Sequence, residues 1–275
     1  MPMTEHPNCK INIGLNIVAK RPDGYHNIES VFYPIPIRDM LEIEKADTFS
    51  FEQDGNVLDC QSSDNLCVKA YRLMQKDFPQ IGPVSIRLTK NIPSGAGMGG
   101  GSSDAAFTIK MLNSLFQLGL RTEQLQGYAA RLGADCAFFI ENNPVFASQK
   151  GDVFQDITLD FSGYRLLLAK PDVGVSTAEA YRNIVPAPAP FDLRKLGSTP
   201  MEEWKQLVTN DFEKSVFEKL PVLREIKERM YQGGAVYAAM SGSGSTIYGF
   251  FAKNQDITEL RTDFEKRFFT AEIEF

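Results

Sequence analysis

Five of the seven residues from Gly95 to Gly101 are glycines, and Ser102 and Ser103 follow them directly. Glycine loses more backbone entropy on folding than any other residue and brings no side chain to a core. A strand-like segment, residues 84–90, precedes the run, and a pattern typical of a helix follows it. Bare N–H groups and the positive end of a helix suit an anion, so the run predicts a site for phosphates.

Other glycine motifs fit the run less well. Gly95, Gly97 and Gly100 match G-x-G-x-x-G, but the helix that follows leads to a second helix rather than to a parallel strand. A dinucleotide-binding oxidoreductase is therefore the disfavoured alternative. No Lys-Ser or Lys-Thr pair follows the glycines, and the HRD and DFG motifs of protein kinases are missing. A flexible linker is disfavoured because patterned elements flank the run.

Lys10 and Asp135 are the charged side chains that could carry chemistry. Lys10 lies on the polar side of an alternating segment, residues 9–17, together with two asparagines and a glycine that would admit a ligand. An ordinary half-exposed strand explains that pattern equally well. Asp135 follows Gly133 and precedes an apolar run. Taken alone it fits a helix N-cap better than a carboxylate that takes a proton from a substrate hydroxyl.

The elements that must position these residues mix strands and helices without regular βαβ alternation, which predicts an α+β fold. Period-two patterns predict strands at residues 9–17, 25–35, 41–46, 49–53, 84–90 and 164–171, and two more within 234–252 around a turn at Ser241–Ser245. Helical spacing predicts helices within residues 62–78, 102–116, 122–133, 176–184 and, broken around Pro221, 204–232. A change of pattern near residue 155 predicts two domains, residues 1–155 and 156–275.

Composition excludes several classes of protein. A chain of 275 residues with 43% hydrophobic residues can bury a core, and a formal charge of -6 argues against a general nucleic-acid binder. The cysteines at positions 9, 60, 67 and 136 form no C-x-x-C pair, which favours reduced thiols over disulfides or zinc. Neither a signal peptide nor a membrane-spanning run is visible, so we expect a cytoplasmic protein without membrane or nucleic-acid partners.

In chain order, the strand with Lys10, the turn PDGYH, the segment PSGAGMGGGSS, the triplet GAD and the turn SGSGS resemble the GHMP kinases. This superfamily includes galactokinase, homoserine kinase and mevalonate kinase. PDGYH, SDNL and the triple glycine resemble most the branch that phosphorylates 4-diphosphocytidyl-2-C-methyl-D-erythritol, over about residues 8–251. Met98 replaces the usual leucine, and Cys136-Ala137 replaces the usual Val-Pro after GAD. A GHMP kinase for a different small alcohol is the alternative.

The resemblance implies an ATP-binding lobe, residues 1–155, a substrate-side lobe, residues 156–275, and an active site in the cleft between them. It implies transfer of the γ-phosphate of ATP to the 2-hydroxyl of the erythritol unit, in non-mevalonate isoprenoid synthesis. Asp135 would be the general base, and Lys10 would keep it ionised and stabilise the transferring phosphoryl. ATP and Mg²⁺ are the implied cofactors, with the metal near Ser102 or Ser103. We expect a monomer or a weak homodimer.

The resemblance also implies two sets of binding residues. The nucleotide set is Asn65, beside the adenine, and the loop residues Pro93, Gly95, Ala96, Gly97, Met98, Gly99, Gly100, Gly101, Ser102 and Ser103. The substrate set is Asn12, Tyr25, His26, Tyr181, Ser241, Gly242, Ser243 and Gly244. Tyr25 and Tyr181 are expected to stack on the two faces of the cytosine ring.

Overall fold

The computed structural model describes residues 2–56, 64–182 and 184–275 and divides into two compact units. Unit 1 is Met1–Lys10, Pro36–Ser94 and Gly99–Asn143, and unit 2 is Ile11–Ile35, Gly95–Met98 and Pro144–Phe275. The chain thus passes between the units after residues 10, 35, 94, 98 and 143. The lobes 1–155 and 156–275 stay a prediction about ligand binding. In the fold, residues 11–35 and 95–98 group with the C-terminal part.

Unit 1 is built on a four-stranded sheet with the order β1-β4-β6-β5. Its strands are β1 (Met3–Glu5), β4 (Met40–Lys45), β6 (Val84–Lys90) and β5 (Ser50–Gly55). β4 pairs antiparallel with β1 and β6, whereas β5 runs parallel to β6. Ile43 is the partner of Ile86, which places two buried isoleucines on one face of the sheet. This apolar face is what the helices of unit 1 cover.

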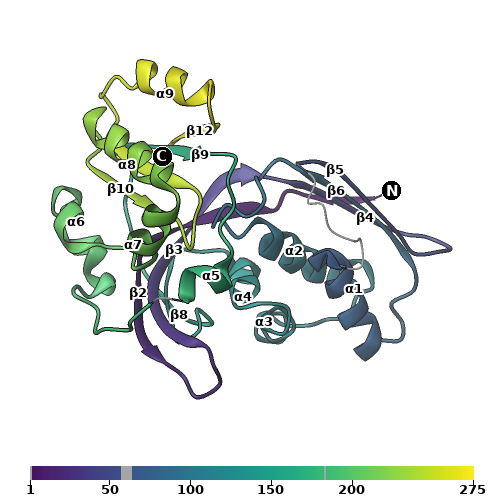
Figure 1. Cartoon of the computed structure of the whole chain (residues 1–275). Helices are drawn as coiled ribbons and strands as arrows, with labels where there is room; N and C mark the ends of the chain where they lie inside the picture. The colour runs from purple at the N-terminus through teal and green to yellow at the C-terminus, as the bar shows by residue number, and fades with distance from the viewer. Residues whose placement is uncertain (1, 57–63, 183) are drawn as a thin grey trace. The chain divides into compact units, whose positions relative to one another are not determined.

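Four helices accompany this sheet: α1 (Leu66–Asp77), α2 (Gly100–Leu115), α3 (Thr122–Ala130) and α4 (Ala134–Glu141). Figure 1 shows them gathered on one side of it. The predicted apolar face of α2 is confirmed, because Ala105, Ile109 and Leu112 are buried. α2 begins at Gly100, two residues before the predicted start, so Ser102 lies in its first turn.

Unit 2 holds most of the sheet β2-β3-β7-β8 and all of the sheet β10-β11-β9-β12. The strands of the first are β2 (Asn8–Lys20), β3 (His26–Arg38), β7 (Val145–Ser148) and β8 (Val153–Asp156). Those of the second are β10 (Tyr237–Met240), β11 (Ile247–Ala252), β9 (Tyr164–Lys170) and β12 (Phe269–Glu274). The predicted hairpins around PDGYH and around the turn after Met240 are both confirmed.

The helices of unit 2 are α5 (Thr177–Tyr181), α6 (Met201–Leu207), α7 (Phe212–Lys219), α8 (Pro221–Gln232), α9 (Thr258–Glu265) and a 3-10 helix (Leu193–Ser198). α8 packs on β10 and β11 through Leu223, Ile226 and Met230, which belong to the apolar core of this unit (Figure 1). The predicted break at Pro221 is confirmed, with proline at the first position of α8, where its missing N–H costs nothing.

β2 departs from the half-exposed strand that the alternation also allowed. Every residue from Asn8 to Ile17 is buried, including Lys10 and Asn12 on the polar side. Buried polar side chains need partners, and on this side of β2 Lys10 pairs with Asp135 and Asn12 donates to Ser30. Within the described ranges, no helix has the length and apolar character that crossing a membrane requires.

Candidate active site

The Lys10–Asp135 pair is present in unit 1. Nζ of Lys10 lies 3.3 Å from Oδ2 of Asp135. The lysine side chain is 4% exposed and that of Asp135 is 34% exposed, so one end of the pair is fixed and the other is accessible. The N-cap interpretation of Asp135 is wrong, because α4 begins at Ala134 and its cap is Gly133. Asp135 instead sits in the first turn of α4.

Gly99 joins the glycine run to this pair. Its φ of +69° lies in the left-handed region, and a Cβ there would be 3.0 Å from the Phe139 ring and 3.3 Å from Cε of Lys10. Gly99 is also the N-cap of α2, and no side chain caps the helix. The first N–H groups of α2 are thus available to an anion beside the Lys10 stem.

The two serines after the glycines differ in environment. Ser102 is half-buried and its hydroxyl contacts the Cys136 thiol, whose pKa burial raises to about 12. Ser103 is fully buried, and its Oγ has no hydrogen-bond partner among the described residues. A buried hydroxyl without a partner is costly, and it fits the role of an oxygen ligand to a hard cation. The described part of the chain contains no cluster of three or more His, Cys, Asp or Glu suited to a metal.

Three motifs far apart in the sequence meet in unit 2. Oγ of Ser241 donates a hydrogen bond to the carbonyl oxygen of Gly97 at 2.8 Å and accepts one from the N–H of Asn12 at 3.2 Å. A Cβ on Gly97, at φ +72°, would lie 2.1 Å from the Ser241 carbonyl oxygen, so only glycine fits. The Thr246 N–H also donates to Ala96 at 3.1 Å. The first half of the glycine run therefore packs against the SGSGS turn and β2.

The SGSGS turn is held by a residue that the sequence reading missed. Nδ2 of Asn210 donates to the carbonyl oxygens of Met240 (2.7 Å) and Gly242 (2.8 Å). Ser243 shares a hydroxyl contact of 3.1 Å with Thr177 of α5, and Gly244 donates to the Ser241 carbonyl at 2.9 Å. Asn210 and Asp211 directly precede α7, and such a pair is typical of a helix start. The sequence pattern therefore indicates a local role for Asn210 and not its bonds to the turn.

The aromatic residues of the substrate set also lie in unit 2. The His26 and Tyr181 rings are stacked, with centroids 4.8 Å apart and planes 15° apart. The Tyr25 side chain is 63% exposed, and Nζ of Lys150 lies 5.4 Å from its ring centroid. Tyr181 also packs edge-on against Phe212 of α7. The stack pairs Tyr181 with His26 rather than with Tyr25 and takes up one face of each ring, so a planar base could stack only on a remaining face.

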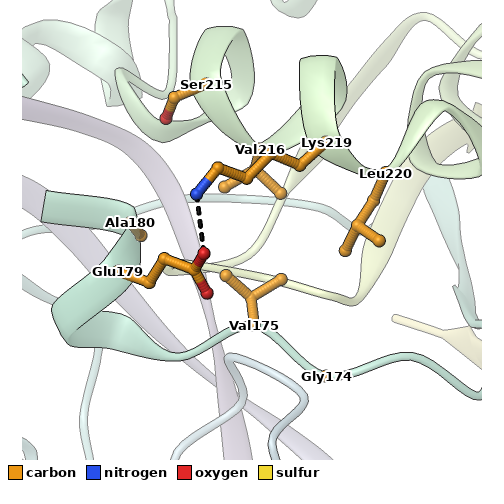
Figure 2. A pocket seen from close by; sticks show the side chains of 8 residues that line it. All are labelled: Gly174, Val175, Glu179, Ala180, Ser215, Val216, Lys219 and Leu220. Carbon is orange, nitrogen blue, oxygen red and sulfur yellow. Dashed lines mark hydrogen bonds and ion pairs between the residues drawn. The ribbon is translucent and has the colours of Figure 1, made fainter. Parts of the chain in front are cut away.

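α5, which carries Tyr181, also lines a pocket through Glu179 and Ala180. Figure 2 shows its lining, which comes from α5, from α7 with the following Leu220, and from residues 174–175. The pocket has a volume of about 170 Å³. Its lining includes the apolar side chains of Val175, Val216 and Leu220. Two charged residues also line it, and Nζ of Lys219 lies 2.7 Å from Oε1 of Glu179. Both charged side chains are 45% exposed, so this ion pair contributes little to stability. No pattern in the sequence predicts this pocket.

The remaining nucleotide-set residues take up structural positions. Asn65 caps α1 by accepting the Cys67 N–H at 2.8 Å and donates to Gln53 at 2.9 Å. Its role beside adenine stays a prediction. Within the loop, the side chains of Ala96 and Met98 are buried and anchor it, whereas Pro93 and Gly100 are half-buried and Gly95 and Gly101 are exposed. The loop thus combines buried anchors with open backbone.

Comparison with known proteins identifies the family. The model of the GHMP kinases N terminal domain matches residues 65–143, and that of the GHMP kinases C terminal domain matches residues 193–270. The 4-diphosphocytidyl-2-C-methyl-D-erythritol kinase of Bacteroides fragilis is 52% identical over 270 residues, which cover 97% of each chain. The chain belongs to this family of GHMP kinases. It is therefore a phosphotransferase with an alcohol acceptor.

Solved structures agree with this GHMP kinase assignment. A crystal structure of 4-(cytidine 5'-diphospho)-2C-methyl-D-erythritol kinase covers 98% of each chain with a TM-score of 0.83 and 27% identity. The mevalonate kinase of Methanococcus jannaschii shares the fold, with a TM-score of 0.70, 14% identity and coverage of 99% of this chain and 97% of its own. The α+β GHMP fold is confirmed, and the oxidoreductase alternative is set aside.

Proposed function

We propose that this kinase transfers the γ-phosphate of ATP to the 2-hydroxyl of 4-diphosphocytidyl-2-C-methyl-D-erythritol. The observation that carries the proposal is the Lys10–Asp135 pair, 3.3 Å apart and next to the uncapped start of α2. The substrate is the one in the names of relatives such as the Bacteroides fragilis and Bacteroides thetaiotaomicron enzymes, each 52% identical. The pair supplies a base and a fixed positive charge.

Asp135 accepts the proton of the substrate hydroxyl in this proposal. Its side chain is 34% exposed, so a hydroxyl can reach the carboxylate in the first turn of α4. Lys10 is buried, so its side chain has no room to move with the substrate. Its ammonium group holds Asp135 in place and stabilises negative charge that develops on the attacking oxygen.

The loop residues Gly99 to Ser103 bind the phosphates through backbone N–H groups at the start of α2. A Cβ at Gly99 would lie 3.0 Å from the Phe139 ring and one at Gly100 2.9 Å from Ile92, so glycine lets this backbone pack closely against the protein. Ser102 or Ser103 would hold Mg²⁺, because Ser103 offers a buried hydroxyl without a partner. When bound, Mg²⁺ would neutralise charge on the phosphates.

The substrate-side residues belong to unit 2. We assign cytosine stacking to Tyr25, His26 and Tyr181, and contacts with the remaining polar groups of substrate to Asn12 and the turn Ser241–Gly244. The His26–Tyr181 stack and the exposed Tyr25 ring support the aromatic part of this assignment. A GHMP kinase for mevalonate-like or amino-acid alcohols has no need for a cytosine site, which makes that alternative weaker.

The test is ADP release by the purified enzyme with ATP, Mg²⁺ and the cytidyl substrate. Mevalonate, homoserine and galactose serve as competing acceptors. We expect activity with the cytidyl substrate alone, and a fall in kcat of about 10²–10⁴-fold for Asp135→Asn. Asp64→Asn removes a surface partner of Lys69 and is the matched control with unchanged kcat. Turnover of another acceptor in place of the cytidyl substrate would reject the proposed substrate.

A further inference from the structure

Unit 1 contains a buried ionic network that the proposed reaction does not use. Nζ of Lys90, at the end of β6, contacts the carboxylate of Asp39 and lies 2.7 Å from Oδ2 of Asp104. The three side chains are 6%, 0% and 3% exposed. Burial lowers the pKa of Lys90, but the two carboxylates outweigh it, so the pKa is raised and the lysine stays charged.

The network is attached to both ends of the glycine run. Oδ1 of Asp39 accepts hydrogen bonds from the N–H groups of Asn91 (2.6 Å) and Ile92 (2.8 Å), which lead into the run. Asp104 lies in α2, just after the run. A Cβ on Gly100 would be 2.9 Å from Ile92 and 3.4 Å from Nζ of Lys90. The segments before and after the loop are thus fixed to one ammonium group.

Stability alone gives little reason for this arrangement. Moving three charges out of water is expensive, and apolar side chains of similar size often stabilise a protein as well or better. Charged hydrogen bonds are directional, whereas apolar packing is not. They can therefore hold particular N–H groups and a particular helix turn at set positions. A loop that binds through its backbone needs its ends held in this way.

We propose that Lys90, Asp39 and Asp104 form a positioning network that holds the ends of the glycine run in the conformation that receives the triphosphate of ATP. The proposal rests on the proposed function for its ligand. The network touches no reacting atom, and Lys10 and Asp135 carry the proton transfer. Its contribution therefore lies in nucleotide affinity and in the order of the loop, rather than in the chemical step.

Asp104→Leu is the variant that tests this. It detaches α2 from the network and leaves Lys90 and Asp39 as a neutral pair, so the protein is expected to fold. Asp104→Asn keeps an acceptor for Lys90 and should restore most of the function. Glu272→Leu is the matched control. Glu272 lies in β12, and its partly buried carboxylate pairs with Arg165 and Arg261.

We expect KM for ATP to rise about tenfold in Asp104→Leu, the value for loss of one charged hydrogen bond, with kcat and KM for the alcohol within about twofold. Amide hydrogen exchange over residues 91–98 should accelerate in this variant without any ligand. Asp104→Asn should return both readouts to within about threefold of the wild type. Glu272→Leu should change the melting temperature but neither readout.

A purely structural network predicts the opposite pattern. The proposal is overturned if Asp104→Leu lowers the melting temperature but leaves KM for ATP and loop exchange at wild-type values. Failure of the proposed function would look different. If the wild type does not turn over ATP, faster loop exchange in Asp104→Leu still upholds the network as the holder of the loop, and only its ligand must be reassigned.

Discussion

At the scale of residues, Lys10 combines burial with a partner that remains accessible. A buried ammonium on a strand cannot adjust to the substrate, so it acts as a fixed charge. We expect Lys10→Met to lower kcat by about 10²–10³-fold with little change in KM for ATP. Asp135 would stay partly hydrated at 34% exposure, so the free energy of unfolding should fall by less than about 1 kcal/mol.

Steady-state kinetics and thermal unfolding check this expectation. Lys69→Met removes an exposed lysine that pairs with Asp64 and should leave both measurements unchanged. A Lys10→Met enzyme with kcat within threefold of the wild type would remove Lys10 from the chemical step.

Gly97 shows how one hydrogen atom in place of a methyl group fixes the loop. Alanine there would combine a φ of +72° with a contact of 2.1 Å to the Ser241 carbonyl oxygen. We expect Gly97→Ala to lower the free energy of unfolding by about 2–4 kcal/mol. Gly95→Ala is the matched control, because its φ is also positive but a Cβ there meets nothing within 4 Å. It should cost only about 1 kcal/mol in chemical denaturation, and equal costs would contradict the close-approach argument.

The thiol of Cys9 gives the pH dependence a clear sign. Burial raises its pKa from 9.0 to about 12, so the folded protein keeps the proton where the unfolded chain loses it. The stabilisation is fully present below pH 9 and is lost as the pH rises from about 9 to about 12. We therefore expect the stability difference between wild type and Cys9→Ala to shrink from pH 8 to pH 10.5 in urea titrations. A constant difference would show that the thiol does not titrate differently in the two states.

At the scale of elements, the sequence pattern predicts a strand, turn or helix break correctly where that feature depends on residues close in the chain. The alternation of residues 9–17, the Pro-Asp-Gly turn and the proline break at residue 221 each depend on near neighbours, and each is confirmed. The N-cap prediction for Asp135 was wrong. Gly133 is the N-cap of α4, so the carboxylate of Asp135 pairs with Lys10 instead. The sequence pattern could not find the contacts of Asn210 with the carbonyl oxygens of Met240 and Gly242, which lie 30 and 32 residues away. Nor could it find the contact of Lys90 with Asp39, which lies 51 residues away.

Asn210 links the start of α7 to the SGSGS turn, and its loss should be felt in that turn. Asn210→Ala leaves two carbonyl oxygens without their donor in a residue that is 4% exposed. We expect a loss of about 2–3 kcal/mol in unfolding free energy and a rise of about fivefold or more in KM for the cytidyl substrate.

Asn113→Ala is the control for this change. Asn113 makes two hydrogen bonds, donating to the carbonyl oxygen of Leu120 and accepting from its N–H in a surface loop of unit 1, where Asn210 makes three. It should lower stability without changing KM. If both variants change KM equally, Asn210 acts through general stability and not through the turn.

At the scale of the whole molecule, the two units are interleaved along the chain. A boundary near residue 155 follows from a change of pattern, but residues 11–35 and 95–98 contact the C-terminal part and belong to unit 2. Sequence pattern cannot reveal this, because membership depends on long-range pairs such as Leu15 with Asn210. The family, by contrast, could be recognised from a few motifs and their order along the chain, because that order can be seen in the sequence without knowing which residues are in contact.

Interleaving predicts that the units unfold together, because neither consists of one continuous segment. Two probes separate them. Trp204 is the single tryptophan and lies buried in unit 2, whereas the buried thiols of Cys9, Cys67 and Cys136 all lie in unit 1. In a Cys60→Ser variant, which removes the one cysteine outside the described residues, thiol labelling at pH 8 reports unit 1 and tryptophan fluorescence reports unit 2. We expect both probes to give the same urea midpoint. Two separate midpoints would show that each unit is stable without the other, and that the five passages of the chain between them do not couple their folding.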